Sequence, residues 1–169
     1  MKHLFSLLCL LATAYVNAQD CNLLKENDQF TQQPKVSTRF MKLGGGDLLL
    51  SIDATKTEIV FDFAPGNTGQ TECYDSKNTI TFWYEGGRLR NFFRNTGYMN
   101  CKGLLQLSFR NIPNATPGNI RRLGTNKVIK IEITDEKKKS RVIELSPEEQ
   151  EMFMKMANCL FEEAKTLGQ

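Results

Sequence analysis

The sequence predicts an α+β fold, with about eight mostly antiparallel strands in a curved or two-layer sheet and one C-terminal amphipathic helix. Three observations support this class. Between residues 36 and 145 apolar side chains recur at every second position, which is the period of a strand with one buried face. A glycine pair interrupts one such stretch and predicts a hairpin. After residue 146 the apolar spacing changes to that of a helix.

Residues 1–18 have the pattern of a signal peptide. A short positive start precedes an apolar run from Leu4 to Val16, and small residues lead to a cleavage site after Ala18. The run is too short to span a bilayer as a helix. We therefore expect a secreted or periplasmic protein without stable membrane insertion, whose residues 19–169 form a single β-rich domain.

The expected strands are separated by turn-forming residues. Residues 19–35 are polar and mixed, and we expect a short helix or an arm tethered by Cys21. Alternating apolar positions then predict strands at 36–40, 48–52, 59–63, 79–85, 88–94, 105–109, 128–133 and 142–145. Glycine, proline, asparagine or charged residues mark the intervening loops.

Gly86 and Gly87 form the centre of the clearest local structure, the stretch 79–94. Both glycines can take the positive φ of a two-residue primed turn, so Trp83 is expected to face Arg90 across the hairpin. One face of this hairpin then gathers Thr79, Thr81, Trp83, Arg88, Arg90, Phe92 and Arg94. Aromatic and basic groups in this mixture stack on sugars or bases and contact anions. The alternative interpretation is an ordinary sheet face, solvated or covered by another layer.

The last predicted element is a helix at 146–166. Ser146 supplies an N-cap, Pro147 suits the first turn, and Glu149 completes a capping box. An apolar stripe at helical spacing follows, made of Phe153, Met156, Ala157, Leu160, Ala164 and Leu167. The stripe predicts a helix that lies on a sheet.

The cysteines predict two disulfides. Cys9 lies in the leader, and the even number that remains in an exported chain allows three connectivities. Cys73 and Cys101 flank the hairpin almost symmetrically, so we pair them. Cys21 then pairs with Cys159, which lies beside the apolar stripe and ties the N-terminal arm to the last helix. No C-x-x-C spacing supports a zinc site.

Several chemistries are excluded by composition. The only histidine is His3, in the segment expected to be removed, so triad, imidazole-base and histidine–metal chemistry are not expected. Removing Lys2 leaves 21 basic against 19 acidic residues, from totals of 22 and 19, which is too balanced for binding nucleic acid by bulk charge. We expect no enzyme activity, no cofactor and no metal.

Carboxylates remain as the residue type from which a sugar hydrolase could be built. The candidates by type are Asp53, Glu58, Asp62, Glu72, Asp75 and Glu85. No spacing selects a pair among them. Asp62 alternates with apolar residues and is expected to point toward water.

The chain resembles small exported bacterial proteins of uncharacterised function. The shared motifs are Cys21-Asn22, Asp28-Gln29-Phe30-Thr31, the strand 35–38, the strand 127–133 and the ending Asn158-Cys159-Leu160. The resemblance implies that Cys21 and Cys159 occur together, and it implies no particular activity. By architecture the chain is also similar to lipocalin-type carriers, although their early Gly-x-Trp is missing.

These observations favour a disulfide-stapled binding or interaction module without catalytic activity. Its partner would be a protein, a glycan or a small apolar ligand, and not a nucleic acid. The alternative is a carrier of a small apolar ligand in a lipocalin-like curved sheet, which requires an internal void. A carboxylate-based carbohydrate hydrolase is the third hypothesis, and it requires two carboxylates converging in a cleft.

Overall fold

The computed structural model describes residues 21–66, 73–87 and 89–167. The predicted signal peptide, Glu72 and Arg88 lie outside these residues. Within the described part the chain forms two antiparallel sheets and one C-terminal helix, so the predicted α+β class is confirmed. The ten strands exceed the eight expected.

The strands are β1 (Leu24–Asn27), β2 (Pro34–Ser37), β3 (Met41–Leu43), β4 (Leu48–Ala54), β5 (Glu58–Pro65), β6 (Thr79–Tyr84), β7 (Arg90–Arg94), β8 (Leu105–Arg110), β9 (Val128–Thr134) and β10 (Ser140–Glu144). Two short 3-10 turns, η1 (Gly44–Gly46) and η2 (Arg121–Gly124), and the helix α1 (Pro147–Ala164) complete the fold. The larger sheet has the order β1-β2-β4-β5-β8, with β3 paired to β4. The smaller sheet has the order β10-β9-β6-β7.

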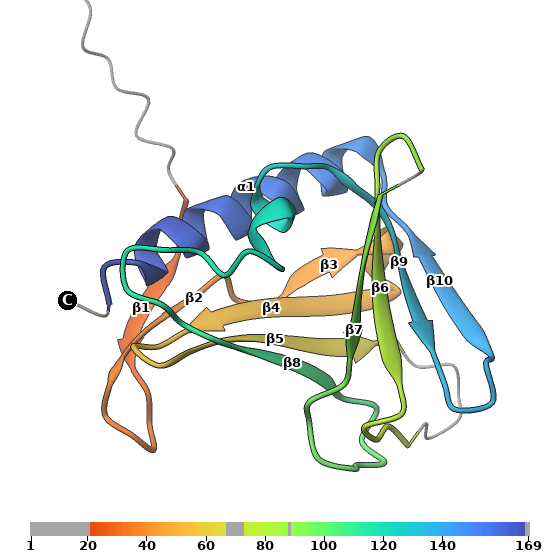
Figure 1. The fold of residues 1–169 in the computed structure, drawn as a ribbon, viewed down its shortest axis with the longest axis horizontal. Coiled ribbons are helices and arrows are strands. Elements are labelled where there is room, and N and C mark those ends of the chain that lie inside the picture. Colours follow the sequence, from red (N-terminus) through yellow and green to blue (C-terminus); the bar gives the residue numbers. More distant parts are fainter. Residues whose placement is uncertain (1–20, 67–72, 88, 168–169) are drawn as a thin grey trace, which may run out of the picture.

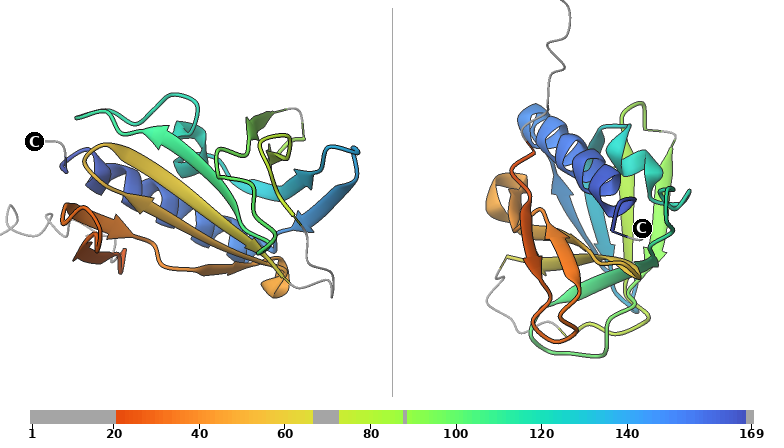
Figure 2. Two further views of the ribbon diagram at one scale, coloured as in Figure 1. Left: turned by 90° about the horizontal axis from the view of Figure 1, so that it is seen from below. Right: turned by 90° about the vertical axis from the view of Figure 1, so that its left-hand side faces the viewer.

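Helix α1 spans both sheets. Figure 1 shows its N-terminal end near the smaller sheet and its C-terminal end beside β1 and β2, and Figure 2 shows it lying along one side of the molecule. The capping box expected at Ser146 is present. The residues of the apolar stripe are buried or partly buried against the core from Phe153 to Leu167, so this side of the helix packs on the sheets.

The core lies between α1 and the inward faces of both sheets. Aromatic rings connect the layers, since Phe82 of β6 stacks on Phe153 of α1 with ring centroids 6.1 Å apart. Phe93 of β7 meets Phe109 of β8 edge-on with ring centroids 5.1 Å apart, and this contact links the two sheets. The helix therefore fills the concave space that the two sheets enclose.

Arg141 of β10 ties the smaller sheet to the larger one. Its Nη1 donates to the carbonyl oxygen of Gly66 at 2.9 Å, and its Nη2 donates to that of Asp47 at 3.1 Å. Gly44 of η1 approaches the same strand, and a Cβ there would overlap the side chain of Ile143. Its φ of +61° also favours glycine.

The N-terminal segment differs from the sequence prediction. Residues expected to form a short helix or arm instead form β1, which pairs with β2 as a hairpin. The turn is closed by Asp28, whose carboxylate accepts hydrogen bonds from the backbone N–H groups of Phe30 and Thr31. The strand expected to reach residue 40 ends at Ser37, because Arg39 takes a φ of +58° that no strand continues through.

Two disulfides staple the domain. Cys21 bonds Cys159 across 138 residues, and Cys73 bonds Cys101 across 28 residues. These are the two pairs that the sequence analysis favours. The first bond fixes the start of the described chain to the buried side of α1. The second joins the segment before β6 to the segment after β7, at the end of the hairpin away from its glycine turn.

Candidate functional site

The β6–β7 hairpin has the register expected from its glycine turn. Trp83 pairs with Arg90, and Thr79 pairs with Arg94. Gly86 and Gly87 both take positive φ, at +84° and +69°. The turn itself differs from the two-residue primed turn expected, because the Gly87 N–H donates to the carbonyl oxygen of Tyr84 at 3.1 Å, which places Glu85 and Gly86 at its centre. The local sequence therefore places the candidate residues on one face of the hairpin, as predicted.

Trp83 is flanked by two cations from neighbouring strands. The guanidinium carbon of Arg90 on β7 lies 5.2 Å from the ring centroid, and the Nζ of Lys130 on β9 lies 5.0 Å from it. The indole Nε1 donates to Glu132 Oε2 at 3.0 Å. The ring is thus held between cations and does not offer a bare face to a sugar, whereas the cationic groups keep donors for an anion.

Strand β9 supplies the residues that sequence reasoning missed. Lys130 lies opposite Trp83 and Glu132 lies opposite Thr81. Their signal was present in the sequence, because both occupy the polar alternation of a predicted strand. What the sequence did not reveal is that β9 pairs with β6.

The face continues across β10 as cross-strand rows. Register places Phe92, Thr81, Glu132 and Val142 in one row across the four strands. Phe92 is 58% exposed and Val142 is 47% exposed, whereas Thr81 between them is buried. We call the outward side of β7-β6-β9-β10 the Trp83 face. It lies opposite the side that packs against α1, because Phe82 points into the core.

The remaining predicted site residues divide into two groups. Arg90 and Arg94 are exposed on the Trp83 face and make no ion pair with any residue that the structure describes. Arg88 lies outside the described residues. The face therefore combines the Arg90 guanidinium beside Trp83, the exposed Arg94, the carboxylates of Glu132 and Glu144, and one exposed aromatic and one exposed aliphatic side chain.

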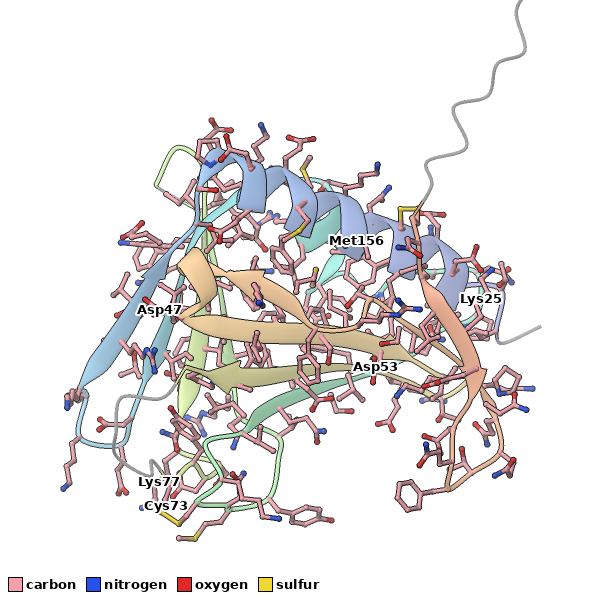
Figure 3. All side chains as sticks on the ribbon, turned by 180° about the vertical axis from the view of Figure 1, so that it is seen from behind. Lys25, Asp47, Asp53, Cys73, Lys77 and Met156 are labelled. Atoms are coloured by element: carbon pink, nitrogen blue, oxygen red, sulfur yellow. A yellow bond between two sulfur atoms is a disulfide. The ribbon has the colours of Figure 1, made fainter. Side chains whose placement is uncertain are left out.

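Three candidate carboxylates of the hydrolase hypothesis, Asp53, Glu58 and Asp62, share the outward side of the larger sheet, whereas Asp75 and Glu85 lie elsewhere. Asp53 and Asp62 are diagonal neighbours on β4 and β5, on the outward side of the larger sheet (Figure 3 labels Asp53). Asp53 is paired with Lys35, whose Nζ lies 2.7 Å from its Oδ2. The Oδ1 of Asp75 accepts a hydrogen bond from the backbone N–H of Lys77, and Glu85 is exposed in the hairpin turn.

Asp62 differs from its expected solvent position. It lies on the outward side but is only partly exposed, and its Oδ1 accepts a hydrogen bond from Gln106 Nε2 at 2.9 Å. Burial raises the pKa of this carboxyl above its ordinary value, opposed by the hydrogen bond from Gln106. The pair lies apart from the surface hollows described next.

The hollows lie at other parts of the surface. One of about 250 Å³ lies between the segment 73–78 and the β9–β10 hairpin, beside Tyr74 and Arg141. A wider groove of about 490 Å³ runs between β1 and the end of α1, beside Lys25 and Glu163. Neither is lined by Asp53 or Asp62.

The interior positions of the carrier hypothesis belong to the packed core. These inward-facing residues are Ile59, Phe61, Phe63, Ile80, Phe82, Leu105, Leu107 and Phe109, all buried except the partly buried Phe109. Phe161 of α1 packs against Phe61 with ring centroids 6.4 Å apart. Helix α1 thus occupies the concave space between the two sheets that an internal ligand would need.

Two further properties concern the described residues alone. They contain no group of three or more histidine, cysteine, aspartate or glutamate side chains placed to hold a metal ion. They also contain no helix with the length and apolar character needed to cross a membrane.

Comparison of the chain with protein-family models, with curated proteins and with solved structures finds no significant match.

Proposed function

We propose that this protein is an exported, secreted or periplasmic, binding module without catalytic activity, and that the Trp83 face binds an acidic segment of a protein partner. Two disulfides support an oxidising compartment, because such bonds persist outside the cytosol. The exposed Phe92 beside cation-flanked Trp83 is the observation that carries the proposal.

Charge and shape favour this partner. Arg90, Arg94 and Lys130 project from the face, and arginine forms paired hydrogen bonds to carboxylates. Phe92 and Val142 add apolar surface in the adjacent row. An extended segment that presents acidic and apolar side chains on the same side would reach both rows, since the rows are two residues apart along each strand, about 7 Å.

Trp83 makes the proposal directly testable, because it is the single tryptophan of the chain. We would titrate the protein with a tryptophan-free peptide rich in glutamate and leucine while following intrinsic fluorescence. The matched probe is the same peptide with glutamine in place of glutamate. The expected result is a saturable change for the acidic peptide that weakens as salt is added.

Two variants separate this site from general charge attraction. Arg90→Ala is expected to weaken binding about tenfold, as for an arginine at the centre of an interface. Arg110→Ala removes an exposed arginine of the larger sheet and should leave the affinity unchanged. Equal affinities of the two variants, or equal binding of the glutamine peptide, would refute the proposed site.

A further inference from the structure

Three loop tips lie at the end of the molecule opposite helix α1. They are the β1–β2 turn at 28–33, the β7–β8 loop at 95–104 and the β9–β10 turn at 135–139. Figure 1 and the right-hand view of Figure 2 both show these tips on one side and α1 on the other. Figure 3 labels Cys73 and Lys77 at this tip end and Met156 on the helix side.

Apolar side chains project from two of the tips. Phe30 is 94% exposed on the first, and Tyr98 and Met99 are 95% and 74% exposed on the second. These side chains make almost no contact with the rest of the protein. A single exposed apolar side chain is normal on a protein surface, but Tyr98 and Met99 are adjacent and lie at the same end of the molecule as Phe30, and this gathering at one end indicates an interaction surface.

The loops that carry them are held in fixed shapes. Asn100 organises the β7–β8 loop, because its Nδ2 donates to the carbonyl oxygens of Tyr98 and Leu104 at 3.1 and 2.8 Å. The Cys73–Cys101 disulfide and the backbone pairing of Tyr74 with Asn100 close the same loop. The projecting side chains are therefore preorganised, which reduces the entropy lost on binding.

The same end presents unpaired positive charge. Lys137, Lys138 and Lys139 follow one another in the β9–β10 turn, Lys102 lies in the β7–β8 loop, and no ion pair among the described residues involves any of the four.

The acidic side chains of this end are engaged nearby. Asp28, Asp75 and Asp135 accept hydrogen bonds from backbone N–H groups of their own turns. Glu136 pairs with Lys77. The hydrogen-bonded aspartates keep their negative charge, so the five lysines at this end, counting Lys77, exceed its four named carboxylates by one, and the positive charge is concentrated in the run Lys137 to Lys139.

We propose that this tip end docks the protein on an anionic lipid surface. The lysines would contact lipid phosphates, and Phe30, Tyr98 and Met99 would enter the headgroup region, where aromatic side chains are favoured. A lipid surface suits these residues better than a protein pocket, because they project from separate convex loops and not into one groove. The association is peripheral and uses no spanning segment.

Vesicle flotation tests the proposal with defined lipids. The wild-type protein should float with vesicles of mixed phosphatidylglycerol and phosphatidylcholine and should stay behind with phosphatidylcholine alone. Replacing Lys137, Lys138 and Lys139 by glutamine should lower the partition coefficient about a hundredfold, at about fivefold per lysine near an anionic surface. No binding of the wild type to the anionic vesicles overturns the proposal.

A matched pair of methionine variants tests the apolar contacts. Met99→Gln removes an apolar side chain from the tip, whereas Met152→Gln makes the same change on α1, where Met152 is 37% exposed. The tip variant should bind the anionic vesicles about tenfold more weakly, as for loss of one buried apolar side chain. The helix variant should bind like the wild type. Equal binding of the two variants overturns the insertion of the tips.

A tryptophan at the tip gives a positive readout of depth. Tyr98→Trp should be quenched by brominated lipids in anionic vesicles much more strongly than the wild type, whose Trp83 lies on the sheet face. Quenching no greater than in the wild type contradicts the proposed orientation. The acidic-peptide titration uses a different probe and different residues, so the two proposals fail or succeed separately.

Discussion

The Cys21–Cys159 disulfide should contribute more to stability than the Cys73–Cys101 disulfide. A disulfide stabilises the fold mainly by restricting the unfolded chain, and the effect grows with the length of the closed loop. The loops span 138 and 28 residues. Loop entropy then gives about 5 kcal/mol for the first bond and about 3.5 kcal/mol for the second.

The position of Cys159 explains why the longer bond should act on the whole domain. Cys159 lies on the buried side of α1, next to Leu160 and Phe161 in the core between the two sheets. Releasing Cys21 therefore frees the helix from β1 at the end where the helix contacts the larger sheet. The loss is expected to appear in the global unfolding transition and not only in local fraying of the N-terminus.

Urea unfolding followed by far-ultraviolet circular dichroism measures both bonds under one condition. The variant Cys21→Ser with Cys159→Ser should lose about 5 kcal/mol of unfolding free energy. The pair Cys73→Ser with Cys101→Ser is the matched control. If the long-loop variant is the more stable of the two, loop length does not determine the contribution of these bonds and the reasoning is wrong.

Three other substitutions test particular contacts. Tyr84→Phe should raise the free energy of unfolding by about 1 kcal/mol in urea melts, because the buried Oη has no hydrogen-bond partner among the described residues. Asn95→Ala should lower it by about 3 kcal/mol in the same assay, since the side chain bonds Asp75, Gly97 and Gln106; a loss under 1 kcal/mol would contradict that role. Burial raises the pKa of Asp62 above 3.8, so this carboxyl's contribution to stability is lost as pH rises through the raised value. The variant Asp62→Asn should therefore become more stable relative to the wild type as the pH rises from 3 to 7. If the difference in unfolding free energy between the two proteins does not change over this range, the raised pKa of Asp62 is contradicted.

Local sequence was sufficient for the hairpin that carries the candidate site. The glycine pair marks the turn and the alternation on either side of it sets the register, so the pairing of Trp83 with Arg90 follows from residues close in the chain, although the turn closes between Tyr84 and Gly87 and not around Gly86 and Gly87 alone. The contribution of Lys130 could not be predicted in the same way. Strand β9 reaches β6 from a distant part of the chain, and no local rule selects which strands pair.

The strands that the sequence analysis missed have weak patterns. β1 has the sequence LKEN and buries little, so alternation does not mark it, and it forms because Asp28 closes its turn onto β2. The exposure of the Phe30 and Tyr98 side chains could not be predicted from the sequence either. Composition places aromatic residues in the core by default, and only the folded loops show that these two project into water.

The course of the smaller sheet relates the two proposed surfaces. β6 begins at Thr79 beside the tip end and runs toward α1, and Figure 1 shows β7, β9 and β10 lying alongside it. Trp83 lies four residues along β6, about 13 Å from Thr79 at the rise of an extended strand. A protein resting on lipid through its tips would hold these strands upright, with the Trp83 row raised above the headgroups.

Since α1 fills the concave space between the sheets, a partner or ligand has to bind to the outer surfaces of the described domain. The Trp83 face and the tip end share no residue, and their cations lie at different heights along the strands. An acidic segment on Arg90 and Lys130 would therefore leave Lys137, Lys138 and Lys139 available to lipid phosphates. The architecture allows the module to bind a surface and a soluble partner simultaneously, because its two cationic regions point in different directions.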